Sequence, residues 1–251
     1  MGMPFGIDVR SAPADPAPVL ARCFGLLRHI DDVFSRWRRG TPMARYAAGI
    51  AVLDDLAPEI TGVLALAHRA RQATGGWFHP HRPDGTPEVD GIVKGWAVAR
   101  VADVLDGAGL RDWCVNAAGD VYVSGAPEPG RRWRIGIADP RDPSAVVAVV
   151  TAGDRTAVAT SGIAERGGHI WNPHTGRAAA ALLSVSVRTA DPLRADVLAT
   201  AAIARGPSCT TWLDAIPGVA ALAVHPDGHT TTTRTWGAPP GRSRPGGDHA
   251  G

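Results

Sequence analysis

The sequence predicts a single α+β domain, with a mixed and mostly antiparallel β-sheet flanked by helices. Apolar residues recur at helical spacing through much of the first hundred residues. The middle of the chain instead carries short apolar runs separated by Gly, Pro and Asp, and a helical stretch then precedes a closing hairpin. With 251 residues, 45% of them hydrophobic and 20% charged, the chain has an ordinary globular composition.

The amino-terminal part begins with a strand, in which Phe5, Ile7 and Val9 alternate with small or polar residues. From Pro16 the spacing becomes helical, and an apolar stripe is formed by Leu20, Phe24, Leu27, Ile30 and Phe34. We expect further helices over residues 56–73, from about 93 to 105, over 193–204 and over 209–215.

The middle and carboxy-terminal parts predict most of the sheet. We expect strands within residues 113–123, 133–137, 145–150, 156–160, 182–187, 219–224 and 230–234. The last two flank Pro226-Asp227-Gly228 and form a hairpin. Residues 1–236 are therefore one domain, and the Gly/Pro/Arg-rich residues 237–251 are expected to be a disordered tail.

Composition excludes several functional classes. The net charge is only +2 and the basic residues are spread along the chain, which argues against nucleic-acid binding. No apolar run reaches the ~18 residues that cross a bilayer, and the amino terminus lacks the pattern of a signal peptide. We therefore expect a cytoplasmic location without membrane insertion. Three widely spaced cysteines predict neither a disulfide framework nor a zinc site.

Lys94 is the only lysine among 26 basic residues, and it lies in a glycine-rich segment, Asp90-Gly91-Ile92-Val93-Lys94-Gly95, that leads into a helix. Glycines at a helix entrance let backbone amides approach an anion, and an ammonium group adds a point charge suited to phosphate. An ordinary junction between a loop and a helix, with a surface lysine, would give the same pattern. The spacing alone does not separate these two interpretations.

Asp196 and Thr200 are four residues apart within a predicted helix, so their side chains project from one face. A carboxylate and a hydroxyl that converge in this way make a hard oxygen site suited to Mg²⁺ and substrate phosphates. The more frequent origin of such a pair is a surface aspartate and a hydroxyl bonded to its own helix backbone.

Three other segments carry polar residues near turns. His169, at the start of His169-Ile170-Trp171-Asn172-Pro173, could act as a general base near neutral pH, although a lone histidine is more often structural. The segments from Asn116 to Asp120 and from Ala159 to Gly162 are each either plain turns or places where backbone amides face a ligand.

Taken together and in this order, these segments resemble the FAD:protein FMN transferases of the ApbE family, from Met1 to about Val224. The matching segments are Phe34–Trp37, Thr74–Pro80, Gly91–Gly95, Asn116–Asp120, Ala159–Gly162, His169–Gly176 and the Asp196/Thr200 helix. The resemblance implies a protein that binds FAD, transfers its FMN half to a threonine hydroxyl of an acceptor flavoprotein and releases AMP.

The resemblance also implies roles for particular residues. Mg²⁺, with Mn²⁺ as the alternative, would be held by Asp196, Thr200, Gly91 and Ala199. FAD would be bound by Trp37, Lys94, Asn116, Gly119, Asp120, Thr160, Ser161 and Gly162. His169 would accept the proton of the attacking threonine. The resemblance leaves the oligomeric state open.

This chain departs from the family pattern at several positions. Asp90 and Ala118 stand where the family usually has glycine, and Asn172 stands where it usually has aspartate. Only about ten residues separate Pro80 from Gly91, where the family commonly has several dozen. The changes at Asn172 and Ala118 keep open the alternative of a FAD-binding protein of weak catalytic activity. A second alternative is a FAD pyrophosphatase that yields FMN and AMP, because the resemblance extends to members that use water as the acceptor.

Overall fold

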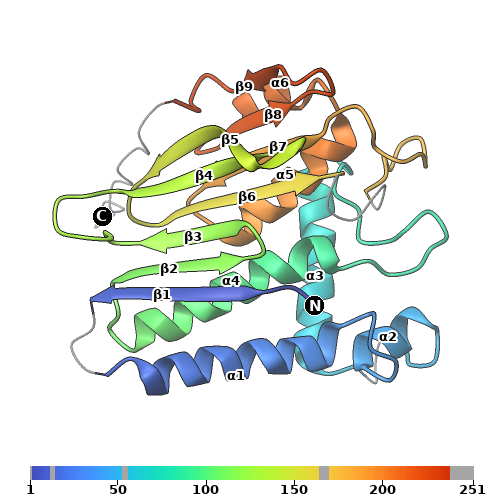
Figure 1. Ribbon diagram of the computed structural model, residues 1–251. Helices are drawn as coiled ribbons and strands as arrows, with labels where there is room; N and C mark the ends of the chain where they lie inside the picture. Colours follow the sequence, from blue (N-terminus) through green and yellow to red (C-terminus); the bar gives the residue numbers. More distant parts are fainter. Residues whose placement is uncertain (1, 12–14, 53–55, 164–169, 238–251) are drawn as a thin grey trace, which may run out of the picture.

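A computed structural model describes residues 2–11, 15–52, 56–163 and 170–237. Its centre is a seven-stranded sheet with the order β1-β2-β3-β6-β7-β8-β9, in which every described pairing is antiparallel (Figure 1). The strands are β1 (Phe5–Ser11), β2 (Asp112–Ala117), β3 (Asp120–Ser124), β6 (Thr156–Gly162), β7 (Ser184–Thr189), β8 (Ala220–Val224) and β9 (Thr230–Thr232). The expected α+β domain with a mostly antiparallel sheet is confirmed.

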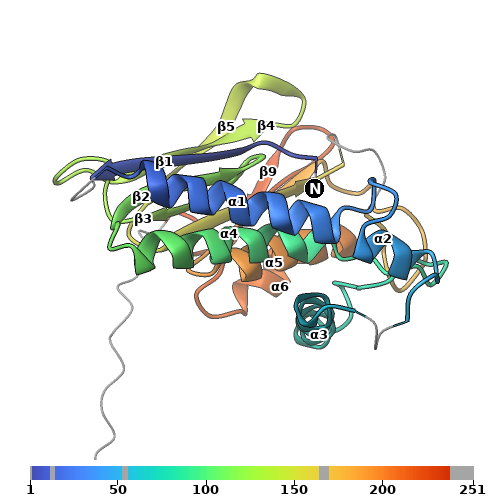
Figure 2. The same ribbon diagram turned by 90° about the horizontal axis from the view of Figure 1, so that it is seen from below.

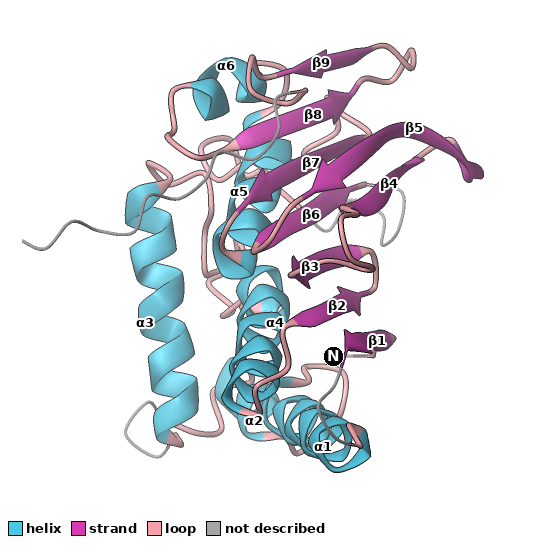
Figure 3. Ribbon diagram, turned by 90° about the vertical axis from the view of Figure 1, so that its left-hand side faces the viewer, coloured by secondary structure: helices cyan, strands magenta, loops and turns pink. Residues whose placement is uncertain are grey.

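Helices cover one face of this sheet, and a two-stranded sheet lies over part of the other (Figure 3). The helices are α1 (Ala17–Phe34), α2 (Pro42–Ala47), α3 (Pro58–Ala73), α4 (Asp90–Gly107), α5 (Pro192–Arg205) and α6 (Cys209–Asp214). Figure 2 shows α1, α4 and α5 side by side beneath the sheet, with α3 farther from it. None of these helices, within the described parts of the chain, has the length and apolar character needed to cross a bilayer.

The hairpin of β4 (Trp133–Asp139) and β5 (Asp142–Ala152) covers the opposite face of the main sheet. The side chains of Trp133, Ile135 and Ile137 alternate with exposed residues along β4, so they all project from one face. They form a second small core with Val123 on β3 and Val158 on β6. The strands β3 and β6 are therefore covered on both faces, and most of their residues are buried.

Particular residues start and end the helix α5 and allow it to pack closely. The Asp191 side chain accepts hydrogen bonds from the amides of Leu193 and Arg194, at 2.9 and 3.3 Å, and Pro192 occupies the first turn. The helix ends at Gly206, whose φ of +79° favours glycine. Its many alanines are buried, because the small side chains allow α4 and the sheet to approach closely.

Two sequence-based expectations differ from the structure. The short helix α2 was absent from the prediction, although Thr41 caps it by accepting a hydrogen bond from the Ala44 amide at 3.2 Å. The helix α4 begins at Asp90, three residues earlier than expected, so Asp90 and Gly91 also lie inside it. The expected tail lies almost entirely outside the described residues.

Candidate functional site

A pocket of about 180 Å³ opens where the first turns of α4 meet α5, the end of β6 and three loops. Among its lining residues are several expected from the sequence, namely Trp37, Gly91, Lys94, Thr160, Ser161, Gly162, Asp196 and Thr200. The fold thus brings together residues that are up to 163 positions apart in the chain. The roles assigned to them remain predictions.

Asp196 lines this pocket and is only 2% exposed. Its Oδ2 accepts a hydrogen bond from the Gly95 amide at 2.9 Å, and its Oδ1 is 3.6 Å from Lys94 Nζ. Burial raises the pKa of the Asp196 carboxyl to about 7, because the charged form loses its hydration, and Lys94 opposes this shift only in part. A positive charge near Asp196 would therefore stabilise the ionised carboxylate.

Gly91 and Gly95 lie where α4 packs closely against α5. A Cβ at Gly95 would lie 2.7 Å from the Pro192 carbonyl oxygen and 3.0 Å from Asp196 Cβ, so only glycine lets α4 and α5 meet here. A Cβ at Gly91 would lie 3.3 Å from Thr200 Oγ1. Of the two interpretations that the spacing left open, the anion-binding turn does not extend to the Gly95 amide, since that amide donates to Asp196.

Lys94 forms ion pairs with two carboxylates. Its Nζ lies 2.9 Å from Asp120 Oδ2 on β3, in addition to the contact with Asp196 on α5. Asp120 is itself buried, and its Oδ1 accepts a hydrogen bond from the Thr160 amide at 3.0 Å. The ammonium group therefore joins α4, α5 and the sheet, and its charge is shared with these carboxylates before any phosphate binds.

Thr200 supplies a hydroxyl to the same corner of the pocket. Its Oγ1 lies 3.3 Å from Ser161 Oγ at the end of β6. Thr200 is one helical turn from Asp196, and both residues line the pocket, as the i, i+4 spacing predicts. Thr160 also lines the pocket, and its hydroxyl is 2.8 Å from Ser186 Oγ.

The donor atoms in this corner suit a hard divalent cation such as Mg²⁺. They are the Asp196 carboxylate and the hydroxyls of Thr200 and Ser161, and the glycine at position 91 leaves room beside Thr200. Among the described residues, no cluster of three or more His, Cys, Asp or Glu side chains could hold a metal. A cation here would thus depend on one carboxylate together with hydroxyl and carbonyl oxygens. The predicted ligand Ala199 is fully buried and is not among the pocket-lining residues.

Asn116 and Gly119, both expected to bind cofactor, shape a tight turn near the pocket. Asn116 Oδ1 accepts a hydrogen bond from the Gly119 amide at 2.9 Å. Ala118 and Gly119 join β2 to β3 as a two-residue hairpin loop, with φ of +49° and +98°. Of the loop residues, Ala118 lines the pocket, although its conformation is one that favours glycine.

The remaining expected residues are placed as follows. His169, the candidate general base, lies outside the described residues. Its neighbours Ile170 and Trp171 line the pocket. Asn172 uses its side-chain oxygen to accept a hydrogen bond from the His174 amide at 2.9 Å, which stabilises the following turn. Trp37 lies on the pocket lining and is 72% exposed.

The pocket also has charged and aromatic lining residues that the sequence-based assignment left out. They are Arg36, Trp77, Phe78, His79, Arg82, Glu88 and Asp90. Arg36 comes from the segment after α1, Glu88 from the segment just before α4, and Asp90 from the first residue of α4. Acidic residues at a helix start are common, so the local sequence carried only a weak signal for this part of the wall.

The fold and the pocket define a class, namely α+β proteins in which a buried helix aspartate and a hydroxyl face a pocket at the edge of an antiparallel sheet. Residues 86–223, which are more than half of the chain, match the ApbE family. The chain therefore belongs to the ApbE family.

The similar proteins agree with this assignment. A FAD:protein FMN transferase from Vibrio cholerae is 34% identical over 134 residues, which are 49% of this chain and 40% of that protein. One from Rhodobacter capsulatus is 33% identical over 169 residues, which are 64% of this chain and 32% of that protein. The chain thus aligns with less than half the length of either relative.

Solved structures show the same fold over nearly the whole chain. The flavin transferase ApbE from Vibrio cholerae has a TM-score of 0.77 at 24% identity, with 94% of this chain and 95% of that chain covered. The ApbE protein from Thermotoga maritima has a TM-score of 0.81 at 21% identity, with the same coverage.

Proposed function

We propose that the protein transfers the FMN moiety of FAD to a threonine hydroxyl of an acceptor protein and releases AMP. The observation that carries this proposal is the placement of Asp196 and Thr200, which face one pocket from adjacent turns of α5. The names of the two relatives and the shared fold support the same activity.

In the proposed reaction, the threonine oxygen attacks the phosphorus atom of the FMN half. A new oxygen–phosphorus bond forms, and the bond from that phosphorus to the bridging oxygen breaks. AMP leaves with the bridging oxygen, and the hydroxyl proton passes to a general base, for which His169 is our candidate. Such a displacement depends mainly on positioning and on neutralisation of charge.

The described residues would contribute to this reaction in distinct ways. Asp196, Thr200 and Gly91 would hold a divalent cation, which when bound supplies charge stabilisation to the phosphates. Lys94 would keep Asp196 and Asp120 in place through its two ion pairs. Trp37, as an exposed ring on the pocket wall, would stack on the flavin, an interaction worth ~1 kcal/mol.

The proposal is tested by incubating the purified protein with FAD and Mg²⁺, together with a protein extract from cells that lack its gene. Transfer predicts a flavin-fluorescent acceptor band on a denaturing gel, and AMP in the solution. Release of FMN and AMP without a fluorescent band would instead identify a pyrophosphatase. Retention of intact FAD without turnover would identify a binding protein. The cytoplasmic location remains part of this proposal.

A further inference from the structure

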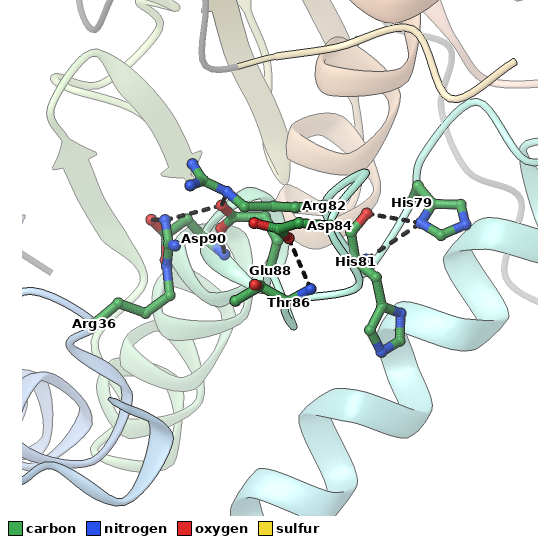
Figure 4. Close-up of polar contacts among 8 residues, drawn as sticks. All are labelled: Arg36, His79, His81, Arg82, Asp84, Thr86, Glu88 and Asp90. Carbon is green, nitrogen blue, oxygen red and sulfur yellow. Dashed lines mark hydrogen bonds and ion pairs between the residues drawn. The ribbon is translucent and has the colours of Figure 1, made fainter. Parts of the chain in front are cut away.

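An ion-pair network closes one wall of the pocket. The Arg36 guanidinium donates from Nε to Asp90 Oδ1 at 3.0 Å and from Nη2 to Asp90 Oδ2 at 2.7 Å. The same Nη2 lies 2.8 Å from Glu88 Oε2, which also accepts a hydrogen bond from Arg82 Nε at 3.2 Å. Figure 4 shows Arg36 reaching toward Asp90 and Glu88 from one side, with Arg82 on the other.

The centre of this network is shielded from solvent, whereas the side chains of Asp90 and Arg82 are 29% and 37% exposed. The side chains of Arg36 and Glu88 are each 14% exposed. The hydrogen bond to Asp90 raises the pKa of Arg36, and burial raises the pKa of Glu88. A paired fork of this kind fixes the direction of a guanidinium, which a lysine at the same position could not reproduce.

The short segment before α4 supplies two members of the network. The Glu88 amide donates to the Pro80 carbonyl at 2.7 Å, and the Arg82 amide donates to the Thr86 carbonyl at 2.8 Å. Residues 81–87 therefore form a compact loop whose ends lie side by side. This loop brings Arg82 and Glu88 to the pocket and so links it to the segment that follows α1.

Trp37 is the next residue after Arg36. Its side chain is exposed, yet the Arg36 guanidinium carbon lies 5.7 Å from the centre of its ring, within the range of a cation–π contact. Both residues line the main pocket and a smaller adjoining hollow that reaches Lys94. Whatever fixes Arg36 therefore also restricts where the Trp37 ring can lie.

We propose that Arg36, held by the bidentate pair with Asp90, is a positioning residue that presents the Trp37 ring to the flavin of bound FAD. This inference rests on the proposed function, since it takes FAD as the ligand. Asp90 stands where the resemblance leads one to expect glycine, and glycine could not hold the guanidinium.

The test measures the dissociation constant for FAD by fluorescence in the variants Arg36→Lys, Asp90→Asn and Trp37→Ala. We expect each to weaken binding about five- to tenfold, as the loss of one stacking contact would. Arg36→Lys in a Trp37→Ala background should cause no further loss, because Arg36 acts through that ring. Arg38→Lys is the matched control, since Arg38 also contacts two carboxylates, Asp31 and Asp32, but is exposed and lies away from the pocket lining.

The outcomes separate this inference from the proposed function. Failure of the unmodified protein to bind FAD would overturn both. If Arg36→Lys and Asp90→Asn bind FAD as tightly as the unmodified protein, the positioning role alone is overturned. It is also overturned if the losses of FAD affinity from Arg36→Lys and Trp37→Ala add up when the two substitutions are combined. If Arg36→Lys fails to fold, FAD binding by Asp90→Asn still tests the positioning role, because asparagine has nearly the same shape as aspartate.

Discussion

Replacement of Asp196 by asparagine should stabilise the metal-free protein while it abolishes turnover. The carboxyl is buried, and its pKa is raised from 3.8 to about 7, so the folded protein is destabilised by ionisation of this group. Asparagine keeps an acceptor for the Gly95 amide but carries no charge. The gain in stability should therefore grow as the pH rises.

The magnitude follows from the two pKa values. The folded state binds the proton more tightly than the unfolded state, so stability falls as the pH rises from about 4 to about 7 and then levels off. Ionisation of this carboxyl therefore lowers the free energy of unfolding by ~2 kcal/mol at pH 5 and by ~4 kcal/mol at pH 8. The attraction of Lys94 for the carboxylate is already included in these values, because Lys94 is among the groups that lower this pKa.

The assay is urea denaturation of the wild type and of Asp196→Asn in the presence of EDTA, at pH 5 and pH 8. We expect the stability of the variant relative to the wild type to increase by ~2–3 kcal/mol between these pH values. Asp103→Asn, which removes an exposed carboxylate from α4, controls for the change in net charge. A difference that stays constant between pH 5 and pH 8 would refute the reasoning.

Three further predictions concern the packing and the pocket wall. Gly95→Ala should destabilise the protein by ~1–3 kcal/mol in urea denaturation, because the new methyl group meets the backbone at the start of α5. The control is Gly107→Ala on the same helix, where the new methyl group meets no atom within 4 Å and should be neutral or stabilising. Equal effects of the two substitutions would contradict this reasoning. Ala118→Gly should increase the free energy of unfolding by ~0.5 kcal/mol and so raise the melting temperature, because glycine adopts a φ of +49° without strain. A lower melting temperature would argue against strain in that loop. Trp37→Ala should change the free energy of unfolding by less than ~0.5 kcal/mol, since the ring is exposed, and a larger change would show that the ring supports the fold.

Local sequence patterns were sufficient for most of the elements. The apolar stripe from Leu20 to Phe34 and the alternation from Phe5 to Val9 correspond to α1 and β1. The expected start of α4 near Val93 is three residues late, because Gly91 is typical of a loop before a helix. The glycines at positions 91 and 95 lie in close contact with Thr200 and with the start of α5, which only the tertiary structure specifies.

The candidate site was predictable where it depends on spacing within one helix. Asp196 and Thr200 were expected to share a face, and they line one pocket. The contact between Lys94 and Asp120 joins a helix to a strand, and Arg36 meets Asp90 across 54 positions. No periodicity encodes such pairs, because they arise from the order in which strands and helices pack. The sequence therefore identified the helix face but not the ion pairs that join residues from different elements.

The proposed function depends most on Asp196, the carboxylate that would support cleavage of FAD. Its most direct test is quantitative mass spectrometry of threonine-linked FMN in the proteome of the organism that encodes the protein. Three strains are compared, with the unmodified gene, without the gene and with Asp196→Ala. We predict modified threonine in the first strain only, with the variant protein present at normal abundance. Equal modification in the Asp196→Ala strain would contradict the role of this carboxylate.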